Sequence, residues 1–318
     1  MAVYVNTNYS ALQGQRYLGN VQNQLTTTYQ RLSSGMRINS AKDDAAGLQI
    51  ADRLTSQING LNQGNRNASD GIALAQTMEA GMDEISGMLQ KVRTLAVQAN
   101  NGTNTSDDRR AIGKEMEALV NEVNRIAQKT TFAGKTILNG KIAGSIFGDP
   151  AAGGGNTAPA GDAGTLTLQV GSNKGDTISF TSNSVMFSKI GSGDLMGDAA
   201  DKVFKTSANG TITVTLTKAK TDTSATSIAA IVELMDSMIS KVDGARADLG
   251  ALQNRLESSI RNQSNVAANE ADARSRIRDA DFAEESANLS QQSIIQQAAA
   301  SMLMQANTRP QLGLSLLG

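Results

Sequence analysis

Apolar residues recur at alternating intervals of three and four along the stretch from Ile228 to Val266. This spacing is the a/d pattern of a coiled coil, and it predicts one continuous helix of roughly 58 Å at 1.5 Å per residue. Such a helix would be marginal in water alone, so other helices must cover its narrow apolar stripe. The stripe consists of Ile228, Ile231, Met235, Met238, Val242, Ala245, Leu249, Leu252 and Leu256.

The same spacing predicts three helices in the N-terminal part. The first, at 11–32, is weak because Gly14 and Thr28 take core positions, and we expect residues 1 to about 40 to be disordered in the free monomer. The second slips in phase near Met78 and ends at the turn signal of residues 100–102. The third follows a capping cluster at 106–108. Their candidate core residues are Leu18, Val21, Leu25 and Leu32; Leu54, Ile58, Leu61, Ile85, Leu89 and Val92; and Met116, Leu119 and Val123.

A last helix is predicted from Phe282, and we expect Pro310 to stop it. Its apolar face is broad and rich in alanine, and the chain then ends in an apolar tail. Nothing within the monomer is expected to cover this tail, which favours burial against other copies. The candidate assembly residues here are Ile294, Ile295, Ala298, Met302, Leu303, Leu316 and Leu317.

Composition changes between residues 141 and 225, where Gly, Ser, Thr and Asp dominate. Period-two alternation at 165–170, 176–180 and 211–217 predicts short strands, and residues 171–175 form a plausible hairpin loop between the first two. The fold class predicted is therefore mainly α: an elongated antiparallel coiled-coil or helical-bundle rod with paired terminal helices and a small β-rich excursion. Whether 141–225 forms an independent domain is left open.

The amino-acid composition excludes several classes of site and partner. The chain has no Cys and no His, so disulfides, thiolate or imidazole metal sites and imidazole catalysis are excluded. The 29 basic and 30 acidic residues nearly balance, which gives no reason to expect nucleic acid as a partner. No apolar stretch is long enough to predict membrane insertion. Asp43 and Asp44 are better interpreted as helix-capping residues than as an acid/base pair. We therefore expect no enzyme activity, no metal and no cofactor.

Two long motifs at opposite ends of the chain resemble those of bacterial flagellins. Residues 32–48, LSSGMRINSAKDDAAGL, are similar to the N-terminal signature of that family, and residues 293–307 with 314–317 resemble the C-terminal one. The resemblance covers about 1–140 and 226–318. It implies a structural subunit that is exported unfolded through the flagellar (type III) secretion channel and polymerises into the filament outside the cell.

The resemblance also suggests a division of the chain and a set of partners. Residues 1–42 plus 275–318 would form the coiled-coil filament core, residues 43–140 plus 226–274 the helical rod, and residues 141–225 a short variable region. The expected partners are many copies of the chain, an export chaperone at the C-terminal segment, and the filament cap and hook-junction proteins. The main alternative is a hook–filament junction protein, which would share the terminal coiled coils.

Flagellins of this type are also ligands of Toll-like receptor 5. The resemblance places the receptor contacts at Lys91, Leu95 and Glu115. The family usually has Arg where Lys91 stands and an acid where Thr94 stands. Because Lys cannot form the planar bidentate contacts of a guanidinium, we expect receptor binding to be retained but weaker.

Overall fold

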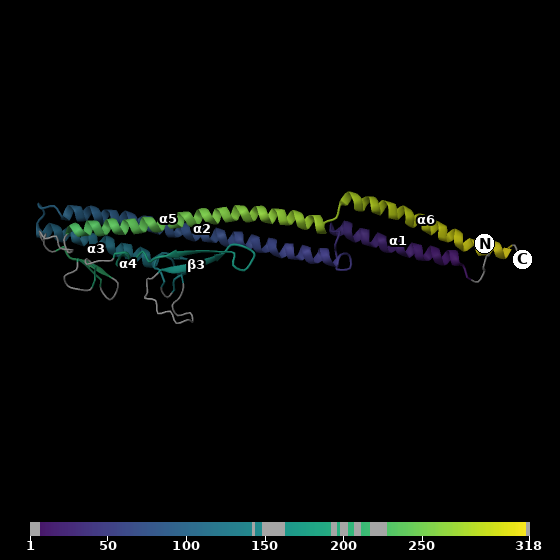
Figure 1. Ribbon diagram of the computed structural model, residues 1–318, viewed down its shortest axis with the longest axis horizontal. Coiled ribbons are helices and arrows are strands. Elements are labelled where there is room, and N and C mark those ends of the chain that lie inside the picture. The colour runs from purple at the N-terminus through teal and green to yellow at the C-terminus, as the bar shows by residue number, and fades with distance from the viewer. Residues whose placement is uncertain are drawn as a thin grey trace. The chain divides into compact units, whose positions relative to one another are not determined.

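The computed structural model describes residues 7–141, 144–147, 163–191, 196–197, 203–206, 211–216 and 228–315. Long helices dominate (Figure 1): α1 (Tyr9–Ser34), α2 (Ala45–Ala99), α3 (Ser106–Lys129), α5 (Ile228–Arg278) and α6 (Phe282–Ser315). The central region holds the short α4 (Phe187–Ile190) and the strands described below. The predicted fold class, mainly helical with paired terminal helices and a small strand-containing middle region, is confirmed.

The chain divides into two compact units. The first contains residues 1–59 and 265–318, and the second contains residues 60–264. Helices α2 and α5 contribute residues to both units. The three-part division expected from the sequence stays a prediction.

The core of the second unit lies where α2, α3 and α5 meet. Within this unit α2 and α5 run antiparallel, as the contacts Arg246–Asp83 (3.0 Å) and Gln253–Glu79 (3.0 Å) show. The residues predicted for this core are buried at Leu61, Ile85, Leu89, Val92, Met116, Val123, Met235, Val242, Leu249, Leu252 and Leu256, and Leu119 is half-buried against them. Leu54 and Ile58 are half-buried and belong to the first unit.

Several predicted helix ends differ from the structure. Helix α5 continues beyond Val266 to Arg278, because the polar residues that follow are good helix formers and Asp272 pairs with Arg276 one turn later (2.9 Å). Helix α6 continues through Pro310 to Ser315, so the prediction that this proline ends the helix is wrong. A proline removes one backbone hydrogen bond, and the rest of the helix retains its own.

The start of α3 shows how local sequence fixes a boundary. Thr105 is the N-cap residue, and its hydroxyl accepts a hydrogen bond from the backbone N–H of Asp108 (3.3 Å). The Asp108 carboxylate accepts from the Thr105 backbone N–H (2.9 Å) and hydroxyl (2.7 Å), which completes a capping box. These hydrogen bonds lower the pKa of Asp108. The predicted capping cluster thus lies at the right place, with its N-cap one residue earlier.

Short strands follow α3. β1 (Thr131–Phe132) pairs with β2 (Lys135–Thr136), and β3 (Gly164–Gln169) pairs with β4 (Thr177–Ser182), both antiparallel. The predicted hairpin loop at 171–175 is confirmed, with Gly175 at φ +98°. β6 (Phe204–Thr206) lies between β5 (Met196–Gly197) and β7 (Ile212–Val214), so the predicted strand at 211–217 forms in part. Residues 217–227 lie outside the described residues.

The β3–β4 hairpin lies directly on α2, where the helix has glycines at 60, 64 and 71. A Cβ atom at Gly64 would stand 1.9 Å from the carbonyl oxygen of Val170, and one at Gly71 would stand 2.5 Å from Leu168 Cδ1. Between them, Asn67 Nδ2 donates to the carbonyl oxygen of Gln169 (2.9 Å). Only residues without a Cβ atom allow this close approach of hairpin and helix.

Candidate functional site

The candidate site is the pair of terminal helices, α1 and α6, which pack side by side in the first unit (Figure 1). Val21 is 4% exposed, and Ala11, Thr28 and Ala299 are also buried between the helices. The sequence predicted disorder for residues 1 to about 40, but residues 9–34 are helical. Helix α1 is ordered because α6 of the same chain packs against its apolar side.

The two ends of the pair are set by polar groups. Asn8 is the N-cap of α1: its Oδ1 accepts from the backbone N–H of Ala11 (3.1 Å), and its Nδ2 donates to the carbonyl oxygen of Ala306 in α6 (2.8 Å). At the other end, Gly35 adopts φ +70° as the C-cap of α1. The Ala280 backbone N–H donates to the Gly35 carbonyl oxygen (3.0 Å) and ties this turn to the start of α6.

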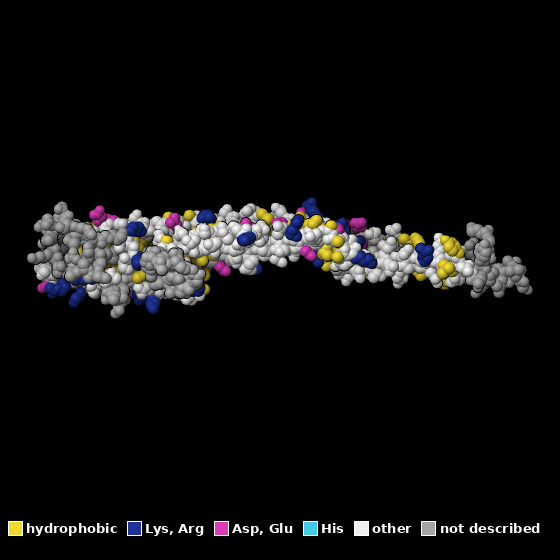
Figure 2. Space-filling model, turned by 60° about the horizontal axis from the view of Figure 1, so that its bottom comes forward, with side chains coloured by type: hydrophobic (Ala, Val, Ile, Leu, Met, Phe, Trp, Pro, Cys, Tyr) yellow, Lys and Arg dark blue, Asp and Glu magenta, His cyan; other side chains and the backbone are white. Residues whose placement is uncertain are grey.

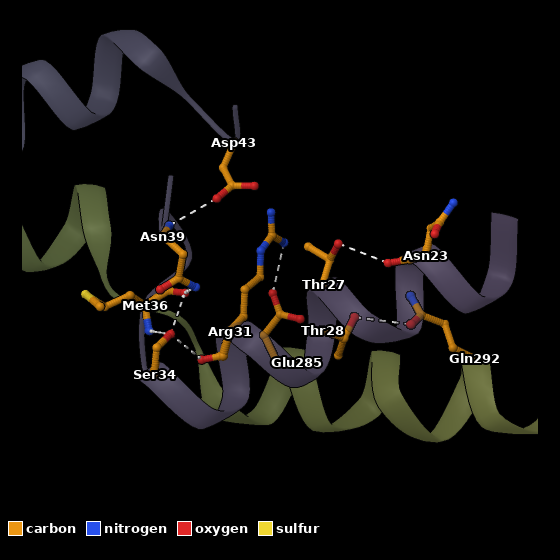
Figure 3. A network of polar contacts seen from close by, with 10 residues as sticks. All are labelled: Asn23, Thr27, Thr28, Arg31, Ser34, Met36, Asn39, Asp43, Glu285 and Gln292. Carbon is orange, nitrogen blue, oxygen red and sulfur yellow. Dashed lines mark hydrogen bonds and ion pairs between the residues drawn. The ribbon is translucent and has the colours of Figure 1, made fainter. Parts of the chain in front are cut away.

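Polar contacts cross the pair near the end of α1 and the start of α6 (Figure 3). Arg31 Nη1 donates to Glu285 Oε1 (3.1 Å), and the Thr28 hydroxyl donates to Gln292 Oε1 (3.2 Å). The Glu285 side chain is 8% exposed, and Arg31 Nε is buried without a hydrogen-bond partner. A buried ion pair adds little net stability, but loss of one partner leaves a charge without compensation. These contacts therefore favour one alignment of the two helices over others.

The turn after α1 is held by Asp43 (Figure 3). Its Oδ2 accepts from the backbone N–H groups of Asn39 (3.1 Å) and Ser40 (2.9 Å), and these hydrogen bonds lower the pKa of the exposed Asp43 carboxyl. Asp44 Oδ1 accepts from the Gly47 backbone N–H (2.9 Å) at the start of α2. The helix-capping prediction therefore holds for Asp44. It is wrong for Asp43, because this carboxylate closes the turn that precedes α2 and bonds no N–H group of the helix.

Apolar side chains remain exposed on the outside of this pair. A groove of about 640 Å³ runs between the helices and is lined by Tyr17 of α1 and by Ile295, Ala298 and Met302 of α6. Tyr17 is 58% and Met302 71% exposed, and Ile294 is 67% exposed. Figure 2 shows hydrophobic side chains gathered on the surface of this part of the chain. Exposed apolar side chains grouped in this way are typical of a contact surface.

Gly14 lies at the bottom of the groove. A Cβ atom there would stand 3.2 Å from Leu303 Cδ1, so the missing side chain allows Leu303 to lean against α1. The weak position in the predicted N-terminal stripe is therefore the point where the two helices approach closely.

The predicted assembly residues divide into three groups by exposure. Val21 is buried, and Leu18, Leu25, Leu32, Ile295 and Leu303 are half-buried in the pair. Ile294, Ala298 and Met302 are exposed. Leu316 and Leu317 lie outside the described residues. Sequence reasoning missed Tyr17 and Tyr29, which are exposed, and the polar contact between Arg31 and Glu285.

The predicted receptor residues lie in the second unit. Lys91 and Glu115 are exposed, and Leu95 is half-buried against the core. Arg93 lies between Lys91 and Leu95 in the sequence. Its Nη2 donates to Asp236 Oδ2 (3.2 Å), and this hydrogen bond lowers the pKa of Asp236. Arg93 is therefore engaged with α5.

Neither a metal centre nor a membrane span is found among the residues that the structure describes. No group of three or more acidic side chains there is arranged to hold a metal ion. No helix within the same ranges combines the length and the hydropathy needed to cross a bilayer.

Comparisons with known proteins match both ends of the chain. The family model for the bacterial flagellin N-terminal helical region matches residues 5–143, and that for the bacterial flagellin C-terminal helical region matches residues 232–317. Flagellin B of Vibrio cholerae serotype O1 is 37% identical over 377 aligned residues, and polar flagellin C of Vibrio parahaemolyticus serotype O3:K6 is 37% identical over 383; both alignments cover 100% of each chain.

A similar fold occurs in a solved structure described as a candidate flagellar hook-associated protein from Vibrio parahaemolyticus. It has a TM-score of 0.53 and 15% sequence identity, and the match covers 74% of this chain and 100% of that chain. At this identity the likeness concerns the fold alone.

Proposed function

The chain belongs to the bacterial flagellin family, the structural subunits of the flagellar filament, and we propose that the outer face of its α1–α6 pair is the surface through which copies polymerise. The observation that carries this proposal is the grouping of exposed apolar side chains on a helix pair whose inner contacts are already made. Family membership implies the homopolymer, and the proposal concerns which residues build it.

The energy available at this surface is substantial. Burying the side chain of Ile294 or Met302 contributes about 1.5–3 kcal/mol, and both are now more than two-thirds exposed. Several such contacts in each subunit, repeated along a polymer, can offset the entropy lost when a subunit docks. Because α1 and α6 already cover each other, docking has to order only side chains and helix ends.

Substitution of Ile294 tests the proposal. Ile294→Asp places a charge on an exposed site, so the monomer should keep its helix content while elongation of filament seeds is lost. Ile294→Val is the matched control and should elongate seeds. Leu303→Asp should also abolish filaments, because it breaks the contact beside Gly14 inside the pair. Normal filament yield from the Ile294→Asp protein would refute the proposed surface.

The hook–filament junction protein remains the alternative function. The fold shared with a candidate hook-associated protein is compatible with it but does not discriminate between the two. Electron microscopy of seeds incubated with purified full-length chain does discriminate. Long filaments would support the filament subunit, whereas a thin collar at the seed ends would support the junction protein.

Finer aspects of the proposed function concern export and partners. We propose that the chain passes unfolded through the flagellar secretion channel, that a chaperone binds its C-terminal segment beforehand, and that it meets the cap and hook-junction proteins outside the cell. The exposed apolar face of α6 supports a chaperone, because such a surface in an unassembled subunit favours aggregation. Co-purification of the cytoplasmic subunit, with and without residues 282–318, tests the chaperone site.

Recognition by Toll-like receptor 5 is a further proposal. It is supported by the exposure of Lys91 and Glu115 on neighbouring helices of the second unit. Lys91→Arg should strengthen signalling in receptor-expressing reporter cells, because a guanidinium makes bidentate contacts that an ammonium cannot. Lys91→Ala and Glu115→Ala should weaken it, and Lys114→Ala serves as an exposed control. Equal signalling from all four variants would exclude these contacts.

A further inference from the structure

The methionines divide sharply by exposure. Met302 and Met304 of α6 are 71% and 67% exposed. Met36 and Met186 are half-buried. The other methionines whose side chains the structure describes are all at most 9% exposed in the second unit: Met78, Met82, Met88, Met116, Met235 and Met238. Oxidation of a thioether by a dissolved oxidant requires access to the sulfur, so Met302 and Met304 are the most accessible sites among the methionines whose side chains the structure describes.

The two exposed methionines differ in their surroundings. Met302 lines the groove between α1 and α6, beside Tyr17, Ile295 and Ala298. Met304 follows two residues later, about 200° further around the helix, and does not line the groove. One exposed thioether is therefore part of the proposed contact surface, and the other provides a matched control on the same helix.

We propose that Met302 is a modification site at which peroxide oxidation blocks polymerisation of the subunit. In this reaction one oxygen atom of hydrogen peroxide bonds to the thioether sulfur and the O–O bond breaks. The sulfur loses two electrons to become a sulfoxide, and the other peroxide oxygen leaves as water. The inference rests on the proposed function, because it assumes that the groove is buried during assembly.

The sulfoxide changes what the groove offers to a neighbouring subunit. A thioether is apolar and adapts to irregular surfaces, whereas a sulfoxide is polar and carries a strong hydrogen-bond acceptor. The sulfoxide oxygen would lie beside the apolar side chains of Ile295 and Ala298. A docked neighbour would remove water from this oxygen without replacing its hydrogen bonds, and such burial is unfavourable. We expect seed elongation to slow by at least about tenfold. Methionine sulfoxide reductases reverse the modification, so the block is reversible.

The test compares peroxide-treated and untreated full-length monomer in seeded elongation, with peptide mass spectrometry to locate the sulfoxides. Each protein is scored by its own ratio of treated to untreated rate. Wild type should fall at least about tenfold, Met302→Leu should stay within about twofold, and Met304→Leu should fall as wild type does. Treatment of oxidised wild type with methionine sulfoxide reductases should restore elongation.

Each outcome bears on a stated part of the inference. Failure of untreated wild type to elongate seeds would overturn the proposed function and this inference with it. Normal elongation of wild type that carries the Met302 sulfoxide would overturn the inference alone, as would equal inhibition of treated Met302→Leu protein. Oxidation of the buried methionines at the same rate as Met302 would contradict the selectivity on which the inference depends.

Discussion

Replacement of Gly64 by alanine should destabilise the second unit, although alanine is the better helix former. In the interior of an exposed helix, Gly→Ala gains about 1 kcal/mol from backbone entropy. At Gly64 the new Cβ would stand 1.9 Å from the carbonyl oxygen of Val170, where an ordinary contact is 3.4–4 Å. The hairpin must therefore retreat by about 1.5 Å or the helix must bend.

The structure allows the size of the effect to be worked out. Forced overpacking costs typically 1–3 kcal/mol, and the atom in the way is backbone, which cannot rotate aside as a side chain can. With a cost at the upper end, the net loss for Gly64→Ala is about 2 kcal/mol after subtraction of the propensity gain. Gly87 lies on the same helix with nothing within 4 Å of its would-be Cβ, so Gly87→Ala should gain about 1 kcal/mol.

Urea unfolding of full-length monomer, followed by far-ultraviolet circular dichroism, measures both changes. The two alanine variants should shift the unfolding midpoint in opposite directions and differ by about 3 kcal/mol. Amide exchange should show faster opening of residues 164–182 in the Gly64→Ala protein alone. A Gly64→Ala midpoint equal to or above that of Gly87→Ala would refute the close approach of hairpin and helix.

Two further predictions concern polar contacts. Glu285→Ala should weaken the α1–α6 pair by about 1.5 kcal/mol, because the half-buried Arg31 guanidinium loses a charged hydrogen-bond partner but keeps partial access to water. Amide exchange in α1 measures this loss. Exchange should not change in the exposed control Glu284→Gln, and slow exchange in the Glu285→Ala protein would contradict the role of the ion pair. The pKa of Asp108 is lowered by its hydrogen bonds with Thr105, so the stabilisation is present above the unfolded-state pKa of about 3.9 and is lost as pH falls through the lower folded-state value. Protection against exchange in the first turn of α3, expressed relative to the intrinsic rate at the same pH, should therefore fall on acidification below about pH 4. In Asp108→Asn this protection should be low at all pH values, and an acid-dependent fall that persists there would assign the effect to another group.

The sequence predicted the buried positions best in helices whose core positions are occupied by large apolar residues. The repeat in α2 and α5 anticipated the buried positions because leucine, valine and methionine at heptad spacing have one stable solution, burial against similar stripes. The hairpin of β3 and β4 was predictable for a similar reason, since strict alternation bounded by a glycine-containing loop has few other outcomes.

The polar contacts were not predictable in the same way. Arg31 and Glu285 each occur in ordinary polar surroundings, and only the tertiary pairing brings them together. The weak stripe of α1 suggested disorder, because a sequence pattern cannot show that Gly14 makes room for Leu303. The continuation of α5 to Arg278 was missed because a polar segment can be helical without a stripe.

The hydrogen bond between Asn8 and Ala306 joins residues 298 positions apart, nearly the whole length of the chain. Closing so long a loop costs roughly 2 kcal/mol more in chain entropy than closing one a tenth as long. Contacts of such high sequence separation form late in folding. The N-terminal helix α1 therefore completes its packing only after α6, the last helix of the chain, is present. A chain cut short before Phe282 would leave α1 without its cover, so an ordered N-terminus reports that the C-terminal helix is present.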